Sequence, residues 1–415
     1  MTETITWQHY LDAAEKACEL ARYSDAEKLF QKALIEAEGS GDSANQAAIL
    51  CRLGELYKVQ GWYSEAENTF KRMLDLNVQK FGQESQGVAE AAGKLASVYR
   101  AQGRFSEVEP HLRCALSIYE KMSDADRVAM AEIIDNLADF YRAHGKYGQA
   151  EPLFQQALSI REAALGPEHP SLGPSLTNLA LLYHASAKYD QAEPLYKRAL
   201  KLAEDSWGPH HPSVAIVLNY QAEMYRIMGD FPKAERIHWR ALKIRQNTLG
   251  MEHPSAAQSL SNLAVLFHIQ CKYDQAEPLY KTLLELRTKD WGPNHPHVAE
   301  ILNNLAEVYH DQGKISEAEP LYWRVVSITQ ENQGSEHANV TRALRSLAEI
   351  YEEQENFQEA DRLYRWGLGL SEKSLGSEHP DVAELLSRYS ALQKKMHVDF
   401  DDDDDDEGRH LDETD

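Results

Sequence analysis

Features that mark several common protein classes are scarce or missing in this sequence of 415 residues. Its four cysteines share no C-x-x-C spacing, so we expect reduced thiols and no disulfide framework. They are Cys18, Cys51, Cys114 and Cys271. No stretch approaches the ~18 consecutive apolar residues of a membrane span. The N-terminal segment MTETITWQHY has no basic region followed by an apolar core, so we expect no secretory signal and a cytoplasmic location.

Sequence motifs of the common enzyme classes are missing too. We find no Gly-rich phosphate loop, no H-E-x-x-H, no G-x-S-x-G and no paired cysteine cluster. Glu223, Glu307 and Glu349 recur at 84- or 42-residue intervals, which indicates separate surface charges instead of a catalytic pair. We therefore predict no catalytic residue, cofactor or metal site. An enzyme accessory, or an enzyme with an unrecognised site, stays open, and a pocket with several strongly shifted pKa values would favour it.

Basic residues are fewer than acidic residues, and the formal net charge at pH 7 is −23. Much of the excess lies in residues 399–415, which contain eleven Asp or Glu and one Arg. Because an acidic chain repels phosphate backbones and anionic lipids, we expect neither nucleic acid nor a membrane as a partner. Residues 397–415 have little apolar surface to bury and are predicted to form a disordered acidic tail. This tail either keeps the chain in solution, the simpler interpretation, or competes weakly with an acidic ligand.

What the sequence does contain is an internal repeat. The segment LGPEHPSL at 165–172 returns in related forms whose histidines are 42 residues apart. These histidines are His169, His211, His253, His295, His337 and His379. A Tyr or Phe with the same period runs from Tyr57 to Tyr351, and a small residue, usually Ala, runs from Ala66 to Ala360. Three markers on one period predict nine similar units and an incomplete tenth in one elongated array.

Each unit is predicted to be a helical hairpin, because its apolar residues follow helical spacing in two runs. A Gly usually separates the runs, where a left-handed residue would end the first helix. Ala187, Cys271 and Glu355 replace this Gly, so their turns must be strained or differently shaped. Prolines such as Pro194 fall near the expected start of the second helix, where amides have no intrahelical acceptor. They place that start close to Asp190.

The repeated histidines have two readings. A Pro fits the first position of a helix, and the preceding His would then serve as a cap or packing residue. A shared metal site would need ligands within about 4 Å of one another, whereas equivalent points on successive hairpins lie roughly 8–10 Å apart. We therefore favour the capping role. His210 with His211, and His295 with His297, leave a local metal site as the weaker alternative.

The segments NLALLY, NLAEVY, AEPLYKRAL and LGPEHP combine small residues and aromatics at fixed helical positions. This pattern resembles the tetratricopeptide repeat, and with its period of 42 it is more narrowly similar to the repeats of kinesin light chains and their relatives. The resemblance covers residues 1–396. It implies an all-α fold, an α-solenoid wound as a right-handed superhelix, with nine helix-turn-helix repeats of about 42 residues and a C-terminal capping helix at 379–396.

The resemblance also implies a concave groove lined by the first helix of each hairpin. Asparagines at the N-L-A step resemble those that hold a peptide backbone in kinesin-light-chain-like grooves, and basic residues or histidines bracket them or follow the aromatic marker. The predicted peptide-binding groove consists of Arg52, Lys58, Lys94, Arg100, Asn136, Arg142, Asn178, His184, Arg226, Asn262, His268, Asn304 and His310. We predict a non-catalytic scaffold or adaptor that binds an extended, acidic and aromatic peptide segment of a protein partner.

Other readings stay open at this stage. The asparagines could pair with a neighbouring helix, and the basic residues could pair with Glu on the surface. The chain could also be a sensor or regulator that binds a short signalling peptide and changes shape. Trp239 and Trp323 replace the lysines found at the same position of neighbouring units, so they could form a second surface for self-association, or lie flat against an adjacent helix.

Overall fold

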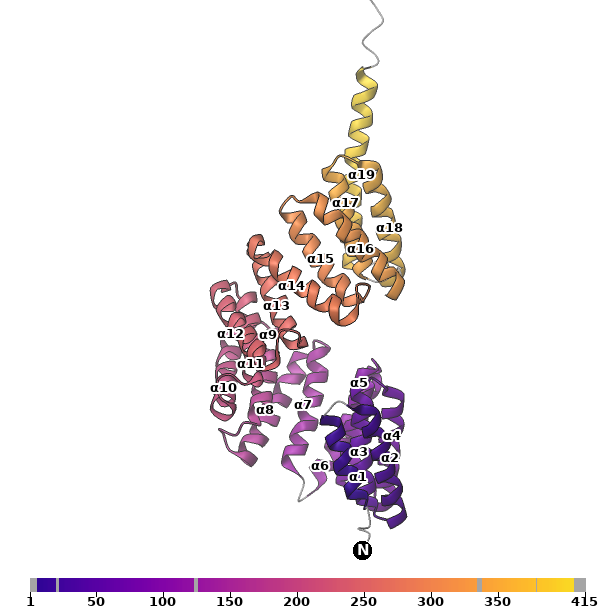
Figure 1. The fold of residues 1–415 in the computed structure, drawn as a ribbon, viewed down its shortest axis with the longest axis vertical. Coiled ribbons are helices and arrows are strands. Elements are labelled where there is room, and N and C mark those ends of the chain that lie inside the picture. Colours follow the sequence, from indigo (N-terminus) through magenta and orange to yellow (C-terminus); the bar gives the residue numbers. More distant parts are fainter. Residues whose placement is uncertain (1–5, 20–21, 123–125, 334–337, 378, 407–415) are drawn as a thin grey trace, which may run out of the picture. The chain divides into compact units, whose positions relative to one another are not determined.

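Residues 6–19, 22–122, 126–333, 338–377 and 379–406 are described by the computed structural model, and all regular structure in these ranges is helical (Figure 1). The chain divides into two compact units, residues 1–209 and 210–415. The first unit contains α1 (Trp7–Glu19), α2 (Tyr23–Ser40), α3 (Ser43–Val59), α4 (Tyr63–Phe81), α5 (Gln86–Ala101), α6 (Phe105–Lys121), α7 (Arg127–Ala143), α8 (Tyr147–Leu165), α9 (Leu172–Ala185) and α10 (Tyr189–Trp207).

The second unit continues the same alternation of helices. It contains α11 (Pro212–Ile227), α12 (Phe231–Leu249), α13 (Pro254–Ile269), α14 (Tyr273–Trp291), α15 (Pro296–Asp311), α16 (Ile315–Gln333), α17 (Ala338–Glu353), α18 (Phe357–Leu375) and α19 (Pro380–Asp406). Helices α1 to α18 pack in consecutive pairs, each an antiparallel hairpin of the predicted kind. The predicted all-α fold of nine hairpins and a C-terminal helix is confirmed within the described ranges.

The turn inside each hairpin has one common geometry. In the Gly-containing turns the glycine is left-handed, for example at Gly61 with φ 76°, and the amide of Trp62 donates to the carbonyl of Tyr57 at 2.9 Å. Ala187, Cys271 and Glu355 adopt the same conformation, with φ between 55° and 58°. A Cβ in this region costs about 1–2 kcal/mol. These turns therefore keep the common shape and carry backbone strain.

The prolines of the second helices lie deeper in the helix than the sequence suggested. Helix α10 begins at Tyr189, next to the expected Asp190, but Pro194 is inside the helix. The same holds for Pro110, Pro152, Pro278 and Pro320. A Pro at this depth leaves the carbonyl four residues earlier without its helical donor. The explanation that these prolines use the unpaired amides of the first turn is therefore wrong.

The repeated histidines cap helices, as expected. The Nδ1 atoms of His211, His253 and His295 each accept the amide two residues later at 3.2 Å, and α11, α13 and α15 each begin at the intervening Pro. His379 makes the same contact before α19. His169 also accepts an amide at 3.2 Å, but α9 begins only at Leu172, so the Pro there precedes the helix. His337 lies outside the described residues. Within the described ranges, no three His, Cys, Asp or Glu side chains are grouped to hold a metal.

Small residues and aromatics form the core in the way the repeat predicted. Ala180, Ala192 and Ala199 have no exposed surface, and Tyr196 is fully buried between neighbouring helices. In the second unit one continuous core cluster extends from Leu242 to Leu392. Because one hairpin cannot bury such a stripe alone, the stacked neighbours supply the burial that stabilises each repeat.

The C-terminal helix is longer than expected. Helix α19 runs from Pro380 to Asp406, past the predicted boundary at 396, and residues 407–415 lie outside the described ranges. The division into a solenoid of residues 1–396 and an acidic tail of residues 397–415 stays a prediction. All four cysteines lie in described ranges and are free thiols. None of the helices described here combines the length and apolar character that crossing a membrane requires.

Candidate functional site

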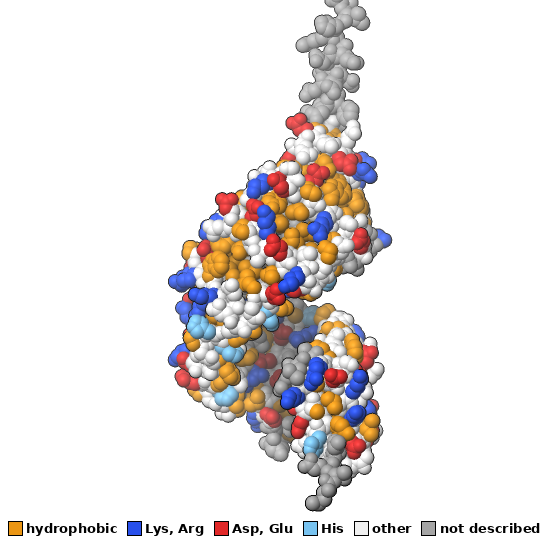
Figure 2. Space-filling model, in the orientation of Figure 1, with side chains coloured by type: hydrophobic (Ala, Val, Ile, Leu, Met, Phe, Trp, Pro, Cys, Tyr) orange, Lys and Arg blue, Asp and Glu red, His pale blue; other side chains and the backbone are white. Residues whose placement is uncertain are grey.

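The predicted groove residues lie on the first helices of the hairpins, and we call the surface that these helices form the first-helix wall. In the first unit it consists of α3, α5, α7 and α9, and in the second of α11, α13, α15 and α17. Within the units, α3 contacts α5, α7 contacts α9 and α15 contacts α17 directly. On the face drawn in Figure 2, basic and acidic side chains are interspersed instead of forming a field of one sign.

At the N-terminal end of the wall, lysines pair with a shared carboxylate. Lys58 of α3 and Lys94 of α5 place their Nζ atoms 2.7 and 3.0 Å from Glu55. Burial raises the pKa of Glu55, but the hydrogen bonds from the two lysines outweigh it, so the pKa lies below its ordinary value. Arg52 is paired as well, 3.3 Å from Glu15 of α1. These three predicted groove cations therefore already have partners.

Two repeats later, at the position equivalent to Glu55, a carboxylate is again shared by two cations. Asp139 of α7 accepts from Arg100 of α5 at 2.8 Å and from Arg142 of its own helix at 2.7 Å. Each of these groups is roughly a third to a half exposed, so the pairs contribute modestly to stability. They do hold the two arginines in fixed positions on the wall.

In the second unit the basic positions are paired in the same way. The Nε of Arg226 lies 2.9 Å from both carboxylate oxygens of Glu223, one helical turn away on α11. His268 of α13 lies 2.7 Å from Asp311 of α15. The basic side chains described here therefore pair with carboxylates of the same surface, as the alternative interpretation expects.

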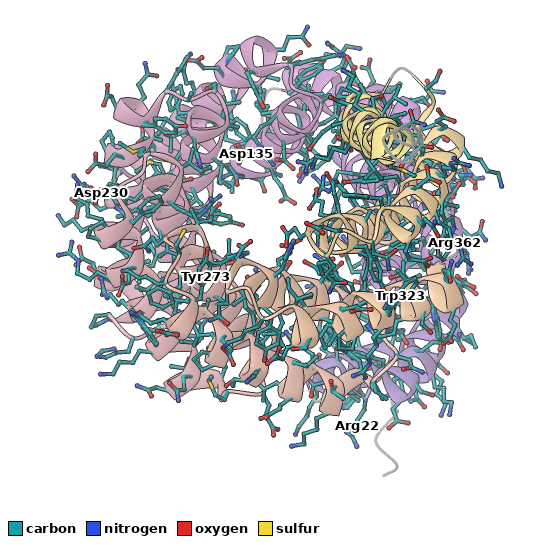
Figure 3. The ribbon with its side chains drawn as sticks, turned by 90° about the horizontal axis from the view of Figure 1, so that it is seen from above. Arg22, Asp135, Asp230, Tyr273, Trp323 and Arg362 are labelled. Carbon is teal, nitrogen blue, oxygen red and sulfur yellow. The ribbon has the colours of Figure 1, made fainter. Side chains whose placement is uncertain are left out.

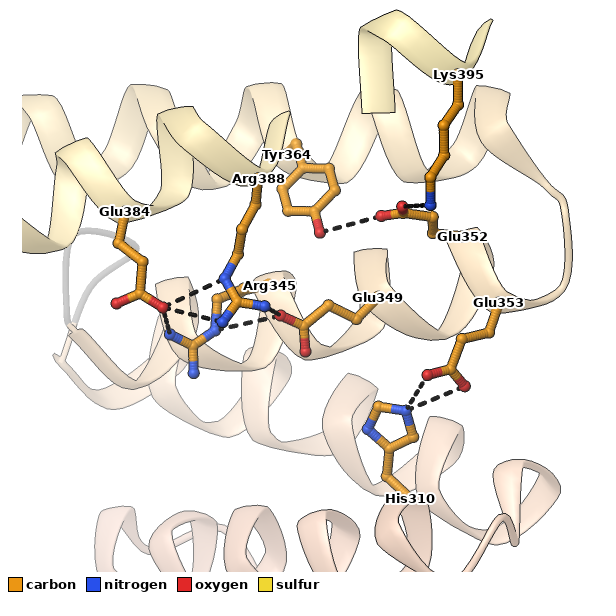
Figure 4. A network of polar contacts seen from close by, with 9 residues as sticks. All are labelled: His310, Arg345, Glu349, Glu352, Glu353, Tyr364, Glu384, Arg388 and Lys395. Carbon is orange, nitrogen blue, oxygen red and sulfur yellow. Dashed lines mark hydrogen bonds and ion pairs between the residues drawn. The ribbon is translucent and has the colours of Figure 1, made fainter. Parts of the chain in front are cut away.

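Toward the C-terminus these pairs join into a network between α15, α17, α18 and α19 (Figure 4). His310 faces Glu353 at 3.3 Å, and Lys395 reaches Glu352 at 2.6 Å. Arg388 bridges Glu349 and Glu384, and Arg345 lies beside the same two carboxylates. This end of the wall is dominated by contacts within the chain.

The predicted asparagines differ from the basic residues, because the side-chain amides of most of them make no hydrogen bond within the described residues. Asn136, Asn178 and Asn304 are half-buried on the wall, and their side chains make no hydrogen bond within the part of the chain that the structure describes. Asn262 accepts a hydrogen bond from Gln258 at 2.9 Å. His184 packs near Tyr189, with ring centroids 6.0 Å apart. An amide that carries both a donor and an acceptor suits a peptide backbone.

One pocket brings predicted residues together on the second unit's wall. It has a volume of about 540 Å³ and lies between α11 and α13, with Arg245 of α12 beside it. It contains two predicted residues, Arg226 and Asn262, but not His268. It is lined by Ile216, Asn219, Tyr220, Glu223, Arg226, Arg245, Gln258, Asn262 and Val265.

The apolar part of this pocket was missed from the sequence. Tyr220 and Ile216 are large side chains with 40% and 48% of their surface exposed on α11. Tyr220 stands in the repeat position that Asn178 and Asn262 occupy in the adjacent hairpins, so the signal was an aromatic in an amide position. Exposed apolar side chains beside a few polar groups are typical of a ligand site.

A buried histidine lies next to this pocket. His238 of α12 has no exposed surface, and its Nδ1 is 3.3 Å from Oδ1 of the pocket residue Asn219. Burial lowers the pKa of His238 to about 4. At 42-residue spacing it replaces the buried aromatics Tyr196 and Tyr280, another substitution visible in the sequence.

The two tryptophans proposed as a second surface are in different environments. Trp239 of α12 has 44% of its surface exposed. Trp323 of α16, which is labelled in Figure 3, is half-buried against the core cluster. They therefore do not form one equivalent pair of exposed rings.

The tetratricopeptide repeat family model matches residues 46–121, 128–205, 213–289, 265–331 and 297–373. No curated protein matches the chain. BtubC (BKLC) from P. vanneervenii is 24% identical, with a TM-score of 0.49 over 55% of this chain and 92% of that chain. A signal transduction ATPase with a tetratricopeptide repeat sensor, from Pyrococcus horikoshii, is 16% identical, with a TM-score of 0.61 over 88% of this chain and 54% of that one. The quorum sensor NprR from B. thuringiensis is 13% identical, with a TM-score of 0.60 over 88% and 98%.

At these identities the solved structures show a shared fold, and the family model covers most of the chain. The helical hairpins of the structure agree with this family match. The chain belongs to the tetratricopeptide repeat family.

Proposed function

We propose that this chain is a non-catalytic protein-interaction scaffold that holds an extended peptide segment of a partner along the first-helix wall. Tetratricopeptide repeats imply protein interaction, and the observation that carries the proposal for this chain is the pocket between α11 and α13. There Tyr220 and Ile216 expose apolar surface beside the amide of Asn262. An aromatic or aliphatic side chain of the ligand would bury this surface, and the amide would bind the ligand backbone.

The asparagines extend the same binding mode to both units. Asn136, Asn178 and Asn304 present half-buried amides at equivalent positions of their repeats. Each could form hydrogen bonds with a peptide backbone, worth about 0.5–1.5 kcal/mol net. Backbone recognition of this kind requires an extended ligand, because a helical peptide has already used its own amides.

We further propose that the ligand carries acidic residues next to an aromatic or apolar anchor. Arg100, Arg142 and Arg226 favour the acids, but they already pair with Asp139 and Glu223. A ligand carboxylate would have to share each arginine with a carboxylate of the wall. The apolar anchor therefore supplies most of the affinity, and the acids supply orientation and sensitivity to salt.

The proposal is tested by panning a phage-displayed random dodecapeptide library on the purified chain and on a Tyr220→Ser, Ile216→Ser variant. We expect enriched peptides that bind the parent and lose about tenfold or more in affinity for the variant, because two apolar contacts are removed. The matched control is Trp366→Ser with Leu249→Ser, which removes an aromatic and an aliphatic side chain of similar exposure from second helices. Equal losses in both variants, or no enrichment at all, would contradict the proposal.

A second candidate is a sensor that changes conformation when it binds a peptide. Two solved structures that share the fold over 88% of this chain are named as sensors. Small-angle scattering with and without an enriched peptide separates the two functions. We expect the chain to be a scaffold, with the same radius of gyration in the presence and absence of the peptide. A radius of gyration that changes on binding would favour the sensor.

Trp239 provides a separate prediction about self-association. An exposed Trp at an otherwise polar position of α12 is a candidate contact between copies of the chain. We expect the parent to associate reversibly in sedimentation velocity and Trp239→Lys to shift toward the monomer. Trp323→Lys serves as the comparison, because this half-buried ring should affect stability more than association. A parent that is monomeric at all concentrations, or an unchanged distribution for Trp239→Lys, removes the self-association surface.

A further inference from the structure

Arg245 of α12 is a buried cation with only neutral partners. Its side chain is 7% exposed, and its Nη1 donates to the carbonyl of Ser255 at 2.8 Å and to the hydroxyl of Ser259 at 2.9 Å. No carboxylate in the described ranges lies within ion-pairing distance of it. Burying a charge without a counter-ion is unfavourable, and here burial lowers the pKa of the guanidinium.

The same repeat position holds an arginine in two other hairpins, and there each has a carboxylate. Arg161 of α8 pairs with Asp135, and Arg287 of α14 lies 3.2 Å from Asp290. Arg287 is as buried as Arg245, with 8% exposure, and also donates to a backbone carbonyl. Both of these arginines are therefore accompanied by an acid. Arg245 lacks that acid and borders the pocket between α11 and α13 instead.

The guanidinium has donors left for a ligand. Arginine carries five N–H groups in a planar fork, and only those of Nη1 have acceptors within the described structure. Nε and Nη2 remain, and they form the edge of the fork that matches the two oxygens of a carboxylate. Tyr220 and Asn262 line the same pocket and could contact the remainder of the ligand.

The charge of the pocket selects the class of anion. Its charged lining residues are Glu223, Arg226 and Arg245, and Glu223 pairs with Arg226. His238 behind the pocket is neutral at pH 7, because burial lowers its pKa to about 4. One positive charge is left over. A carboxylate balances it, whereas a phosphoryl dianion would leave excess negative charge close to Glu223.

We propose that the pocket between α11 and α13 is a carboxylate-binding subsite in which Arg245 binds one carboxylate of the peptide ligand through Nε and Nη2. The carboxylate is either an Asp or Glu side chain or the C-terminal carboxylate of the ligand. This assignment rests on the proposed peptide-binding function and makes it specific, since the site recognises an acid at one fixed distance from the group that packs on Tyr220. In this pocket Arg245, and not Arg226, which already pairs with Glu223, is the residue that selects for the acid.

The test uses two random peptide libraries, one with internal randomised residues and one with free C-termini, panned on the parent, Arg245→Gln and Arg287→Gln. Gln removes both the charge and the donor fork, and Arg287→Gln is the matched control because its arginine has the same repeat position but lies outside this pocket. We expect the parent and Arg287→Gln to enrich an acid at one internal position or a free C-terminus, and Arg245→Gln to lose that preference. The library that shows the preference identifies the source of the carboxylate.

Affinities of one enriched peptide then measure the effect directly. Converting its acid to the amide should weaken binding to the parent about tenfold or more, and binding to Arg245→Gln less than twofold. Arg245→Lys, which keeps the charge and loses the fork, should give an intermediate effect, and thermal melts confirm that all variants are folded. Equal acid dependence in the parent and Arg245→Gln, or tighter binding of a phosphoserine version, would overturn the subsite. Peptides that still depend on Tyr220 in that case would leave the proposed function intact.

Discussion

Replacing Arg161 by Met is expected to destabilise the first unit by about 3–5 kcal/mol, because it leaves the buried carboxylate of Asp135 without its counter-ion. Asp135 of α7, labelled in Figure 3, is 8% exposed and accepts from Arg161 of α8 and from Ser175 of α9, whose Oγ lies 3.3 Å away. Burial raises the pKa of Asp135 even with the arginine present. The three residues join α7, α8 and α9, so loss of the cation should weaken the contact between two hairpins.

Urea denaturation followed by circular dichroism measures this effect. Arg198→Met is the matched control, because Arg198 pairs with Glu162 at 2.6 Å but is 36% exposed, and such a pair contributes at most about 1 kcal/mol. A double variant, Asp135→Leu with Arg161→Met, should regain most of the lost free energy of unfolding, because no buried charge remains. A loss below about 1 kcal/mol for Arg161→Met would show that Asp135 is not the buried, paired charge described here.

Acidification is expected to destabilise the second unit through His238. The pKa of this histidine is about 4 in the folded chain, because burial disfavours its charged form, against an ordinary value near 6.5. Between these values the unfolded chain binds the proton and the folded chain does not, so the free energy of unfolding falls as pH drops from about 6.5 to 4. Each pH unit across this interval lowers the free energy of unfolding by about 1.4 kcal/mol. The free energy of unfolding is therefore lower by about 2 kcal/mol at pH 5 and by about 3 kcal/mol at pH 4.

The matched variant is His238→Phe, which places in α12 the kind of buried aromatic found at the same position of neighbouring hairpins. Phe does not titrate, so the free energy of unfolding of this variant should change less than that of the parent between pH 7 and pH 5. The contribution of Asp and Glu side chains is common to both chains and cancels in the difference. Identical pH profiles for the two chains would contradict the neutral, buried state of His238.

The repeat period was sufficient to predict the architecture from the sequence. A fixed spacing of 42 residues places each Tyr, Ala and His at an equivalent point of a hairpin, so the packing of one unit applies to the others. The histidine caps followed from the His-Pro pair. The role of Pro194 did not follow from the sequence. The pattern located the start of α10 correctly, but it did not show that this helix contains a Pro beyond its first turn.

The wall was predicted less completely, because its chemistry depends on contacts between repeats. Arg100 contacts Asp139, which is 39 residues later in the chain, and His268 contacts Asp311, which is 43 residues later. Partners on adjacent hairpins are therefore separated by the repeat period of 42 residues minus three or plus one. A search for opposite charges at these separations would have found them. Tyr220 was visible as an exception to the asparagine series. Arg245 was not, because its burial depends on how α12 packs against Ser255 and Ser259 of α13.

Hydrogen–deuterium exchange of the full chain, with and without an enriched peptide, shows whether the first-helix wall binds the partner. We expect slower exchange on binding in α11 and α13, at the pocket that contains Tyr220 and Arg245, with smaller protection along neighbouring first helices. Protection confined to second helices, such as α14, α16 or α18, with α11 and α13 unchanged, would contradict it.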